Sequence, residues 1–127
     1  MSKVTLTNPS SLGPAIMPYS QAASANGFLF VAGQVALDKD NNVVAPGDVR
    51  EQTKVAIERV RTILAEHDLG LEDIVSSTNY VTSLEHLAGF NEVWAEMFGD
   101  HRPALATVVA GLLLEGLVVE IMPIAAL

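Results

Sequence analysis

The sequence predicts an α+β fold, in which one β-sheet has two helices packed on one of its faces. Two segments show the periodicity of amphipathic helices, and the segments around them show the alternation or the valine and isoleucine content of strands. Their order is strands, helix, strand, helix and two strands. The 127 residues contain no internal repeat and no linker, so we expect a single domain over residues 1–127.

The N-terminal part of the chain is expected to form strands around a tight turn. Residues 3–7 alternate in polarity, and Asn26-Gly27 is a strong signal for a β-hairpin turn. Residues 28–37 follow as a strand with Gly33 in its middle. A glycine inside a strand has no side chain to pack, so it predicts a bulge or a close approach to the backbone.

The first helix is predicted over residues 49–67, with Asp48 capping its N-terminus. Apolar residues recur at helical spacing on one face, and charged residues of alternating sign occupy the other side. We interpret the charged side as a solvated surface rather than a binding site. The apolar set is Val49, Ala56, Val60, Ile63 and Leu64, and the charged set is Glu51, Lys54, Glu58 and Arg61.

A further strand and the second helix come next along the chain. Residues 74–81 alternate as a strand, and Ser83 then caps a helix predicted over residues 84–98. Asn91 lies on or beside the apolar stripe of this helix, where a single polar side chain is more often structural than functional. The stripe comprises Leu87, Phe90, Trp94, Met97 and Phe98.

Two apolar runs, residues 105–114 and 117–127, close the chain on either side of Glu115-Gly116. This pattern predicts two strands joined by a tight turn. Because the runs are almost continuously apolar, we expect both faces of these strands to be covered. If the two strands pair, one face could bring Glu120 near Leu105 and Thr107.

Glu120 is the one charge that interrupts these apolar runs. A carboxylate inside a buried strand is costly unless it is paired or used chemically. One interpretation is therefore an acid/base whose pKa is raised by its surroundings. The other is an edge position, at which Glu120 reaches solvent or a structural partner.

The composition argues against several classes of function. The net charge is −8 and seven residues are Lys or Arg, which disfavours a nucleic-acid groove. Cysteine is absent and the three histidines have no partner at ligand spacing, so we expect no metal site. No Gly-rich phosphate motif occurs.

The apolar residues bear on location and assembly. No run is long and uncharged enough to predict a membrane span, and the N-terminus lacks the apolar region of a signal peptide. We therefore expect a cytoplasmic protein. The mean hydropathy of +0.34 is high for a small soluble monomer, which indicates apolar surface buried between subunits.

Short motifs typical of one family run along almost the whole chain. They are Pro18-Tyr19-Ser20-Gln21-Ala22, Gly27 with Phe28–Val31, Ala32-Gly33-Gln34, Gln52, Thr78–Val81, Asn91 with Phe98, Pro103-Ala104, and Val119-Glu120-Ile121 with Ile124-Ala125. In order and spacing the chain resembles the RidA family of reactive intermediate deaminases, also called the YjgF or L-PSP family. The resemblance implies a chorismate-mutase-like (RidA-type) fold with one mixed sheet. It also implies a homotrimer, whose sheets form a central barrel with three clefts between subunits.

The resemblance further implies that small imines or enamines are hydrolysed in those clefts, without a cofactor, to a keto compound and ammonia. Glu120 would be the catalytic residue. Active deaminases of the family have an arginine at the position of Leu105, where it grips the substrate carboxylate. Leucine cannot do this, so we expect a more apolar pocket and weak 2-iminopropanoate deaminase activity. The residues expected to bind substrate are Tyr19, Gly33, Asn91, Leu105 and Thr107.

Two functions stay open on this basis. The first is a deaminase that acts on an imine or enamine other than the usual amino-acid-derived ones. The alternative is a trimer that binds a small apolar or aromatic metabolite, or a partner protein, without turnover. Ribonuclease activity or translation inhibition, which has also been attached to the family, is disfavoured by the acidic charge.

Overall fold

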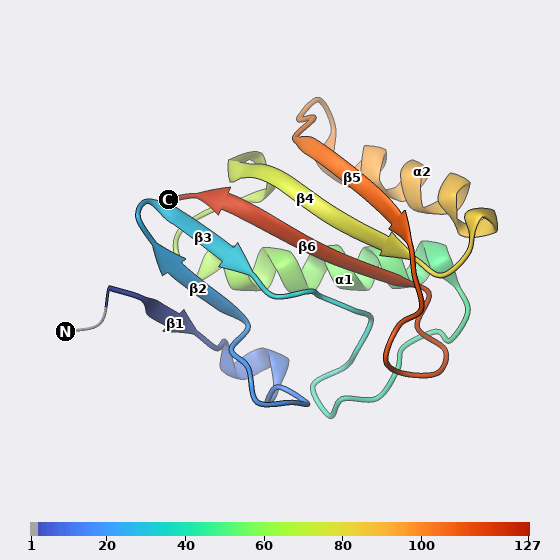
Figure 1. Ribbon diagram of the computed structural model, residues 1–127, viewed down its shortest axis with the longest axis horizontal. Helices are drawn as coiled ribbons and strands as arrows, with labels where there is room; N and C mark the ends of the chain where they lie inside the picture. The colour runs from blue at the N-terminus through green and yellow to red at the C-terminus, as the bar shows by residue number, and fades with distance from the viewer. Residues whose placement is uncertain (1–2) are drawn as a thin grey trace.

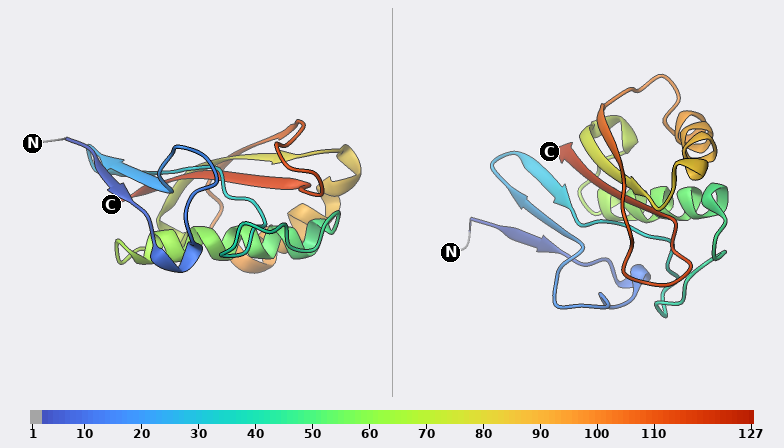
Figure 2. Two further views of the ribbon diagram at one scale, coloured as in Figure 1. Left: turned by 90° about the horizontal axis from the view of Figure 1, so that it is seen from below. Right: turned by 45° about the vertical axis from the view of Figure 1, so that its right-hand side comes forward.

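A computed structural model gives the structure of residues 3–127, in which two helices lie along one face of a six-stranded sheet (Figure 1). Both helices lie on the same side when the sheet is seen edge-on (Figure 2, left). The α+β class and the mixed sheet with its helices on one face are therefore confirmed. The strands are β1 (Thr5–Thr7), β2 (Ala22–Ala25), β3 (Phe28–Val31), β4 (Ile74–Val81), β5 (Ala104–Val109) and β6 (Val119–Ala126), and the helices are α1 (Val49–Ala65) and α2 (Leu87–Phe98).

The strand order across the sheet is β1-β2-β3-β6-β4-β5. The pair β4 and β5 is parallel, because α2 carries the chain back across the sheet between them, and the other pairs are antiparallel. The last strand, β6, is inserted between β3 and β4. The C-terminal strand thus lies near the middle of the sheet and carries residues that face neighbours on both sides.

The predicted C-terminal hairpin is wrong. β5 and β6 are not neighbours, because β4 lies between them and pairs with both. The first run also ends as a strand at Val109 rather than at residue 114, and residues 110–118 form a loop. The expectation that both faces of these strands are covered fails for both strands. β5 is exposed along its whole length at the edge of the sheet, and β6 is fully buried on one face only.

The N-terminal hairpin forms as predicted. Asn26 and Gly27 both have positive φ, at 52° and 85°, as a two-residue type I′ turn requires. The strand after it is shorter than expected, because β3 ends at Val31 instead of continuing to residue 37. Beyond this point Gln34 rejoins β6 through an isolated bridge to Ile121, so Ala32 and Gly33 interrupt the ladder.

The first helix begins where its cap predicted, whereas α2 begins at Leu87, three residues after the predicted start at residue 84. The Asp48 carboxylate accepts a hydrogen bond from the Glu51 amide at 3.1 Å, and α1 ends two residues before the predicted boundary at residue 67. Ser83 likewise caps a short 3-10 turn, Leu84–His86, which precedes α2.

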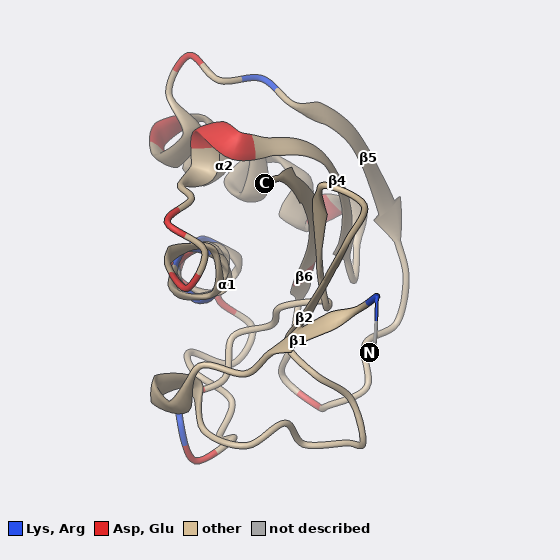
Figure 3. Cartoon of the chain, turned by 90° about the vertical axis from the view of Figure 1, so that its left-hand side faces the viewer, with Lys and Arg blue, Asp and Glu red and all other residues tan. Residues whose placement is uncertain are grey.

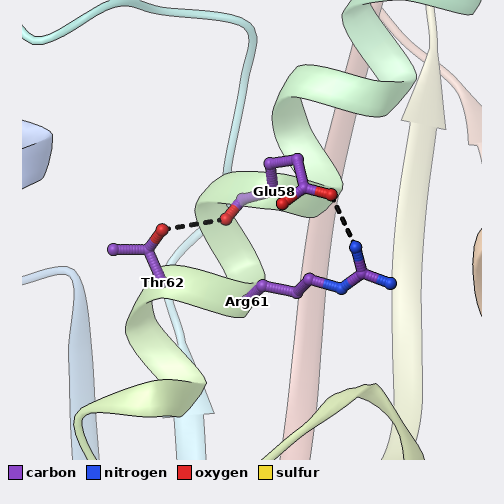
Figure 4. Close-up of polar contacts among 3 residues, drawn as sticks. All are labelled: Glu58, Arg61 and Thr62. Atoms are coloured by element: carbon purple, nitrogen blue, oxygen red, sulfur yellow. Dashed lines mark hydrogen bonds and ion pairs between the residues drawn. The ribbon is translucent and has the colours of Figure 1, made fainter.

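The charged side of α1 is exposed, as expected. There Glu58 pairs with Arg61 at 2.6 Å, and its backbone carbonyl accepts a hydrogen bond from Thr62 at 3.0 Å (Figure 4). Exposed pairs of this kind contribute at most about 1 kcal/mol. This surface is therefore a solvated helix face rather than a site.

The core lies between the helices and the sheet, where alternate residues of each strand are buried against helix residues such as Ile57 and Phe90. The opposite face of the sheet, called the open face below, has no covering layer in the single chain. It exposes Leu6, Phe28, Phe30, Val108 and Met122, at 38–62% of their surface. Charged residues gather on the helices and connecting segments instead (Figure 3). Among the described residues, Glu120 is the only charge within the six strands.

Candidate functional site

Glu120 lies on the open face of β6. Its neighbours in sequence, Val119 and Ile121, point into the core at 0% and 1% exposure, so alternation directs Glu120 to the other side. Across the ladder Glu120 is opposite Tyr80 of β4. The carboxylate is half-buried there, because the loops at this end of the sheet rise around it.

Gly33 provides the space that this carboxylate occupies. Gln34 holds the segment against β6, since its amide donates to the Ile121 carbonyl at 2.8 Å and its carbonyl accepts from the Ile121 amide at 3.0 Å. A Cβ atom on Gly33 would lie 2.5 Å from Oε2 of Glu120, closer than real Cβ contacts. The predicted close approach at this glycine is therefore confirmed, and the approaching group is the Glu120 side chain.

Burial raises the pKa of Glu120 above its ordinary value. The cause is desolvation alone: within residues 3–127 the carboxylate makes no hydrogen bond or ion pair. A carboxylate that is partly desolvated and unpaired holds its proton more tightly than one in water. Its raised pKa makes it a stronger base than an ordinary carboxylate, which is a property expected of an acid/base residue.

A cavity of about 440 Å³ opens in front of this carboxylate. Glu120 and Gly33 form one end, Tyr19 stands beside them, and the rest of the wall is almost entirely apolar. The size falls in the range of small-molecule sites. The apolar lining comprises Ile16, Met17, Pro18, Ala32, Val35, Leu113, Leu114 and Leu117.

Tyr19 also borders a second, more open hollow on the open face. This hollow measures about 690 Å³ and is lined by Leu6, Ala23 and Phe30 among others. Tyr19 therefore stands between a pocket that contains an acid and a wider apolar depression along β1, β2 and β3. Tyr19 is 41% exposed and contributes to the walls of both hollows.

Gln52 of α1 fixes the loop that supplies three leucines of the cavity wall. Its amide nitrogen donates to the carbonyls of Val44, Ala45 and Gly116 at 2.8–3.1 Å. Its carbonyl oxygen accepts the Val118 amide at 2.8 Å. The side chain is completely buried, so these bonds are made in a dry environment, where unmet polar groups are costly.

A buried polar chain supports the Gly33 segment from the helix side. Arg59 of α1 donates to Oε1 of Gln34 and to the Leu37 carbonyl, each at 3.0 Å. Gln34 in turn donates to Oε1 of Gln21 at 2.8 Å. These bonds tie the backbone beneath the cavity to the first helix, so the floor of the cavity rests on fixed elements.

Of the predicted site residues, the structure brings Tyr19, Gly33 and Glu120 together around one cavity. It does not bring Leu105 and Thr107 to them. Those two residues are opposite Ser77 and Asn79, which point to the helix side of β4, whereas Glu120 is opposite Tyr80 on the open face. The expectation that strand pairing places Leu105 and Thr107 near Glu120 is therefore wrong within one chain.

Asn91 also lies outside the cavity. It is exposed on α2, in the helix layer, and does not line the pocket that holds Glu120. Leu105 and Thr107 are likewise exposed, on the free edge of the sheet. Three of the six residues expected at the site are thus available to a neighbouring molecule but not to a ligand bound at Glu120 of the same chain.

Sequence reasoning missed most of the cavity wall. The sequence pattern places the leucines of residues 110–118 in strands. They lie in a loop instead, because β4 is inserted between β5 and β6 and the two segments do not form a hairpin. Gln52 was recognised as a family marker without a role. Among the described residues there is no cluster of three or more His, Asp or Glu placed to hold a metal ion. None of the described helices is long and apolar enough to cross a membrane.

The fold and cavity define a small α+β protein with an acid-containing pocket at the open face of its sheet. The model of the family described as Endoribonuclease L-PSP matches residues 10–127. A RutC family protein of Pyrococcus abyssi is 40% identical over 110 residues, which is 87% of both chains. This chain therefore belongs to the L-PSP family, which is the YjgF or RidA family that the motifs indicated.

Solved structures agree with this assignment. A conserved Rid family protein from Yersinia pestis matches with a TM-score of 0.90 and 28% identity, over 98% of this chain and 99% of that one. Escherichia coli TdcF with bound serine matches with a TM-score of 0.87 and 27% identity, over 97% and 98% of the two chains.

Proposed function

We propose that this chain is a cofactor-free deaminase, which hydrolyses the C=N bond of a small imine, or of an enamine after tautomerisation, to a carbonyl compound and ammonia. The observation that carries the proposal is the half-buried Glu120 carboxylate, which has no partner among the described residues and faces an apolar cavity of about 440 Å³. Family membership and the serine bound in the TdcF structure support a small-molecule site in this fold.

The reaction needs one group that moves protons in both directions. With a protonated imine in the cavity, the Glu120 carboxylate takes a proton from water as the water oxygen bonds to the imine carbon. The resulting carbinolamine then receives that proton on its nitrogen. Glu120 then takes the proton of the carbinolamine hydroxyl as the C–N bond breaks and the carbonyl forms. Glu120 passes this second proton to the released ammonia, which leaves as ammonium. The raised pKa favours the first of these steps, in which the carboxylate takes a proton from water.

A homotrimer in the cytoplasm is part of the proposal. The open face exposes large apolar side chains such as Leu6, Phe30 and Met122, and an exposed apolar surface of this kind is typical of an interface. The fully exposed edge strand β5 is available to the same interface. A neighbouring subunit would then supply Leu105 and Thr107 to the cavity that contains Glu120.

The alternative is a trimer that binds a small metabolite without turnover. Leu105 favours this alternative, because the family resemblance places there the arginine that grips the substrate in active deaminases. The apolar wall of the cavity is compatible with either function. We do not propose the ribonuclease activity that the family's description names, since the net charge is −8 and no basic residue lines the cavity.

Ammonia release separates the two functions. A panel of imines, generated in the cuvette from amines and amino acids by oxidases, would be followed with and without the protein, with heat-denatured protein as the control. The proposal predicts that at least one imine is hydrolysed faster than it decays spontaneously. Binding of a panel member without any acceleration would support the non-catalytic alternative.

A further inference from the structure

The wall of the Glu120 cavity contains one charged group and almost no other polar side chain. Loop 110–118 contributes Leu113, Leu114 and Leu117, and the opposite wall contributes Ile16, Met17 and Val35. Polar side chains in the lining are limited to Tyr19 and Glu120. A ligand would therefore meet a carboxylate at one end and hydrocarbon on the remaining sides.

None of the basic residues lies in position to neutralise that carboxylate. All seven Lys and Arg residues fall within the described part of the chain, and none lines the cavity. Arg59 of α1 donates to Gln34 and Leu37. Its charge also interacts with Tyr19 in the cavity wall, whereas no charge interaction from the described residues acts on Glu120. The others are Lys3 before β1, Lys39 in the turn after Leu37, Arg50, Lys54 and Arg61 on exposed positions of α1, and Arg102, which donates to the Gly99 carbonyl.

The subunit interface that we propose adds two assigned residues to the cavity. Its contribution to the cavity would be Leu105 and Thr107, and neither carries a charge. An unpaired carboxylate that is partly removed from water has an uncompensated cost. A positively charged or N–H-bearing ligand removes that cost, whereas a ligand carboxylate placed beside Glu120 adds a second negative charge to it.

We infer that this cavity takes the cationic form of an amine or of an amine-derived imine that bears an apolar group of roughly benzene-ring size and no carboxylate. The part of this inference that concerns imines rests on the proposed function. The positive charge and the apolar group are inferred from the geometry of the cavity alone. On this inference imino acids are poor substrates, and imines derived from amines are the preferred ones. The supplying reaction would then be the two-electron oxidation of an amine by an enzyme with its own electron acceptor, or the loss of water from a β-hydroxy amine, and not the corresponding reaction of an amino acid.

Three probes of nearly equal size test the charge preference without any turnover: benzylammonium, benzyl alcohol and benzoate. Their dissociation constants would be measured at neutral pH by ligand-observed NMR or calorimetry. We expect benzylammonium to bind at least about ten-fold more tightly than benzoate, because charges a few ångströms apart at a partly desolvated site differ by more than that factor. Benzyl alcohol should lie between them. Equal or tighter binding of benzoate would overturn the inference.

Three variants assign the preference to its source. Glu120→Gln should bring benzylammonium and benzyl alcohol to similar affinity, and Glu115→Gln, an exposed acid in the same loop, should change nothing. Leu114→Ala should weaken all three probes together, because it shortens the apolar wall. A charge preference that survives Glu120→Gln would contradict the inference.

The outcome also separates this inference from the proposed function. If benzylammonium is preferred but no imine is hydrolysed, the deaminase proposal fails and the assignment of the ligand class stands. If imino acids are hydrolysed well and benzoate competes with them, the deaminase proposal stands and the inference about the ligand fails.

Discussion

The carboxylate of Glu120 lies directly against the α-carbon of Gly33. A methyl group at residue 33 would come within 2.5 Å of Oε2 and 2.7 Å of Cδ. Gly33 belongs to a segment that is bridged to β6 through Gln34, so the backbone cannot easily retreat. The position of the acid therefore depends on the absence of a side chain at residue 33.

Gly33→Ala should displace the Glu120 carboxylate while leaving the fold intact. The φ angle of Gly33 is not in the left-handed region, so alanine strains the contact and not the backbone. We expect ligand affinity and any turnover to fall at least about ten-fold, as a small misplacement of a reacting group costs that much or more. Gly111→Ala is the matched control, because a Cβ there meets nothing within 4 Å. Equal activity of the two variants would contradict this account.

The raised pKa of Glu120 predicts a pH dependence of stability. Between the ordinary value of 4.5 and the higher pKa of the folded chain, the folded state retains a proton that the unfolded state has lost. This contribution to stability is complete below 4.5 and disappears as the pH rises through the folded pKa. Glu120→Gln lacks this loss, so its melting temperature should rise relative to wild type between pH 4 and pH 7. A constant difference across that range would show that Glu120 titrates normally.

We expect a homotrimer from the family resemblance, with the exposed apolar face of the sheet as part of its interface. Light scattering after size exclusion should give three times the 13.5 kDa mass of one chain. Phe30→Asp, which puts a charge into the apolar open face, should dissociate it at micromolar concentration, whereas Lys54→Asp on the outer surface of α1 should not. A monomeric wild-type protein would contradict the proposal that the open face is a subunit interface.

The sequence predicted local elements well because their signals are local. Asp48 marks the start of α1 through a single side-chain hydrogen bond, and Asn26-Gly27 specifies its turn through two positive φ angles. Strand β4 was predicted with its observed limits, residues 74–81, from alternation. The pairing of strands could not be predicted in this way, because it depends on residues far apart in the sequence. A short polar break such as Glu115-Gly116 is equally compatible with a tight turn and with the end of a loop.

The candidate site was predictable only in part for the same reason. Gly33 was singled out by its place within an apolar segment, but the group that approaches it comes from β6, at the far end of the chain. The leucines of the cavity wall lie in a loop whose course follows from the insertion of β6 between β3 and β4. The assignment of Asn91 rested on resemblance, and that of Leu105 and Thr107 also on a pairing of the two C-terminal strands that does not form. Their roles at the site stay predictions.

Leu105 predicts weak activity on 2-iminopropanoate. Losing an arginine that grips a carboxylate in a partly desolvated cleft costs about 2–5 kcal/mol. By the rate equation this corresponds to a loss of specificity constant on the order of 30-fold to several thousand-fold. Leu105→Arg should raise ketoacid release from this substrate if the neighbouring subunit's residue 105 reaches the cavity. Strong activity of the wild-type protein would refute the view that this leucine removes the standard reaction.

The central claim is that Glu120 moves the protons of C=N hydrolysis. It is tested most directly by the initial rate of ammonia release from the best amine-derived imine, compared between wild type, Glu120→Gln and Glu115→Gln at equal oligomer content. The account predicts that Glu115→Gln matches wild type and that Glu120→Gln loses about 100-fold or more, the usual range for removal of a general acid/base. A folded Glu120→Gln protein that retains the wild-type rate would contradict it.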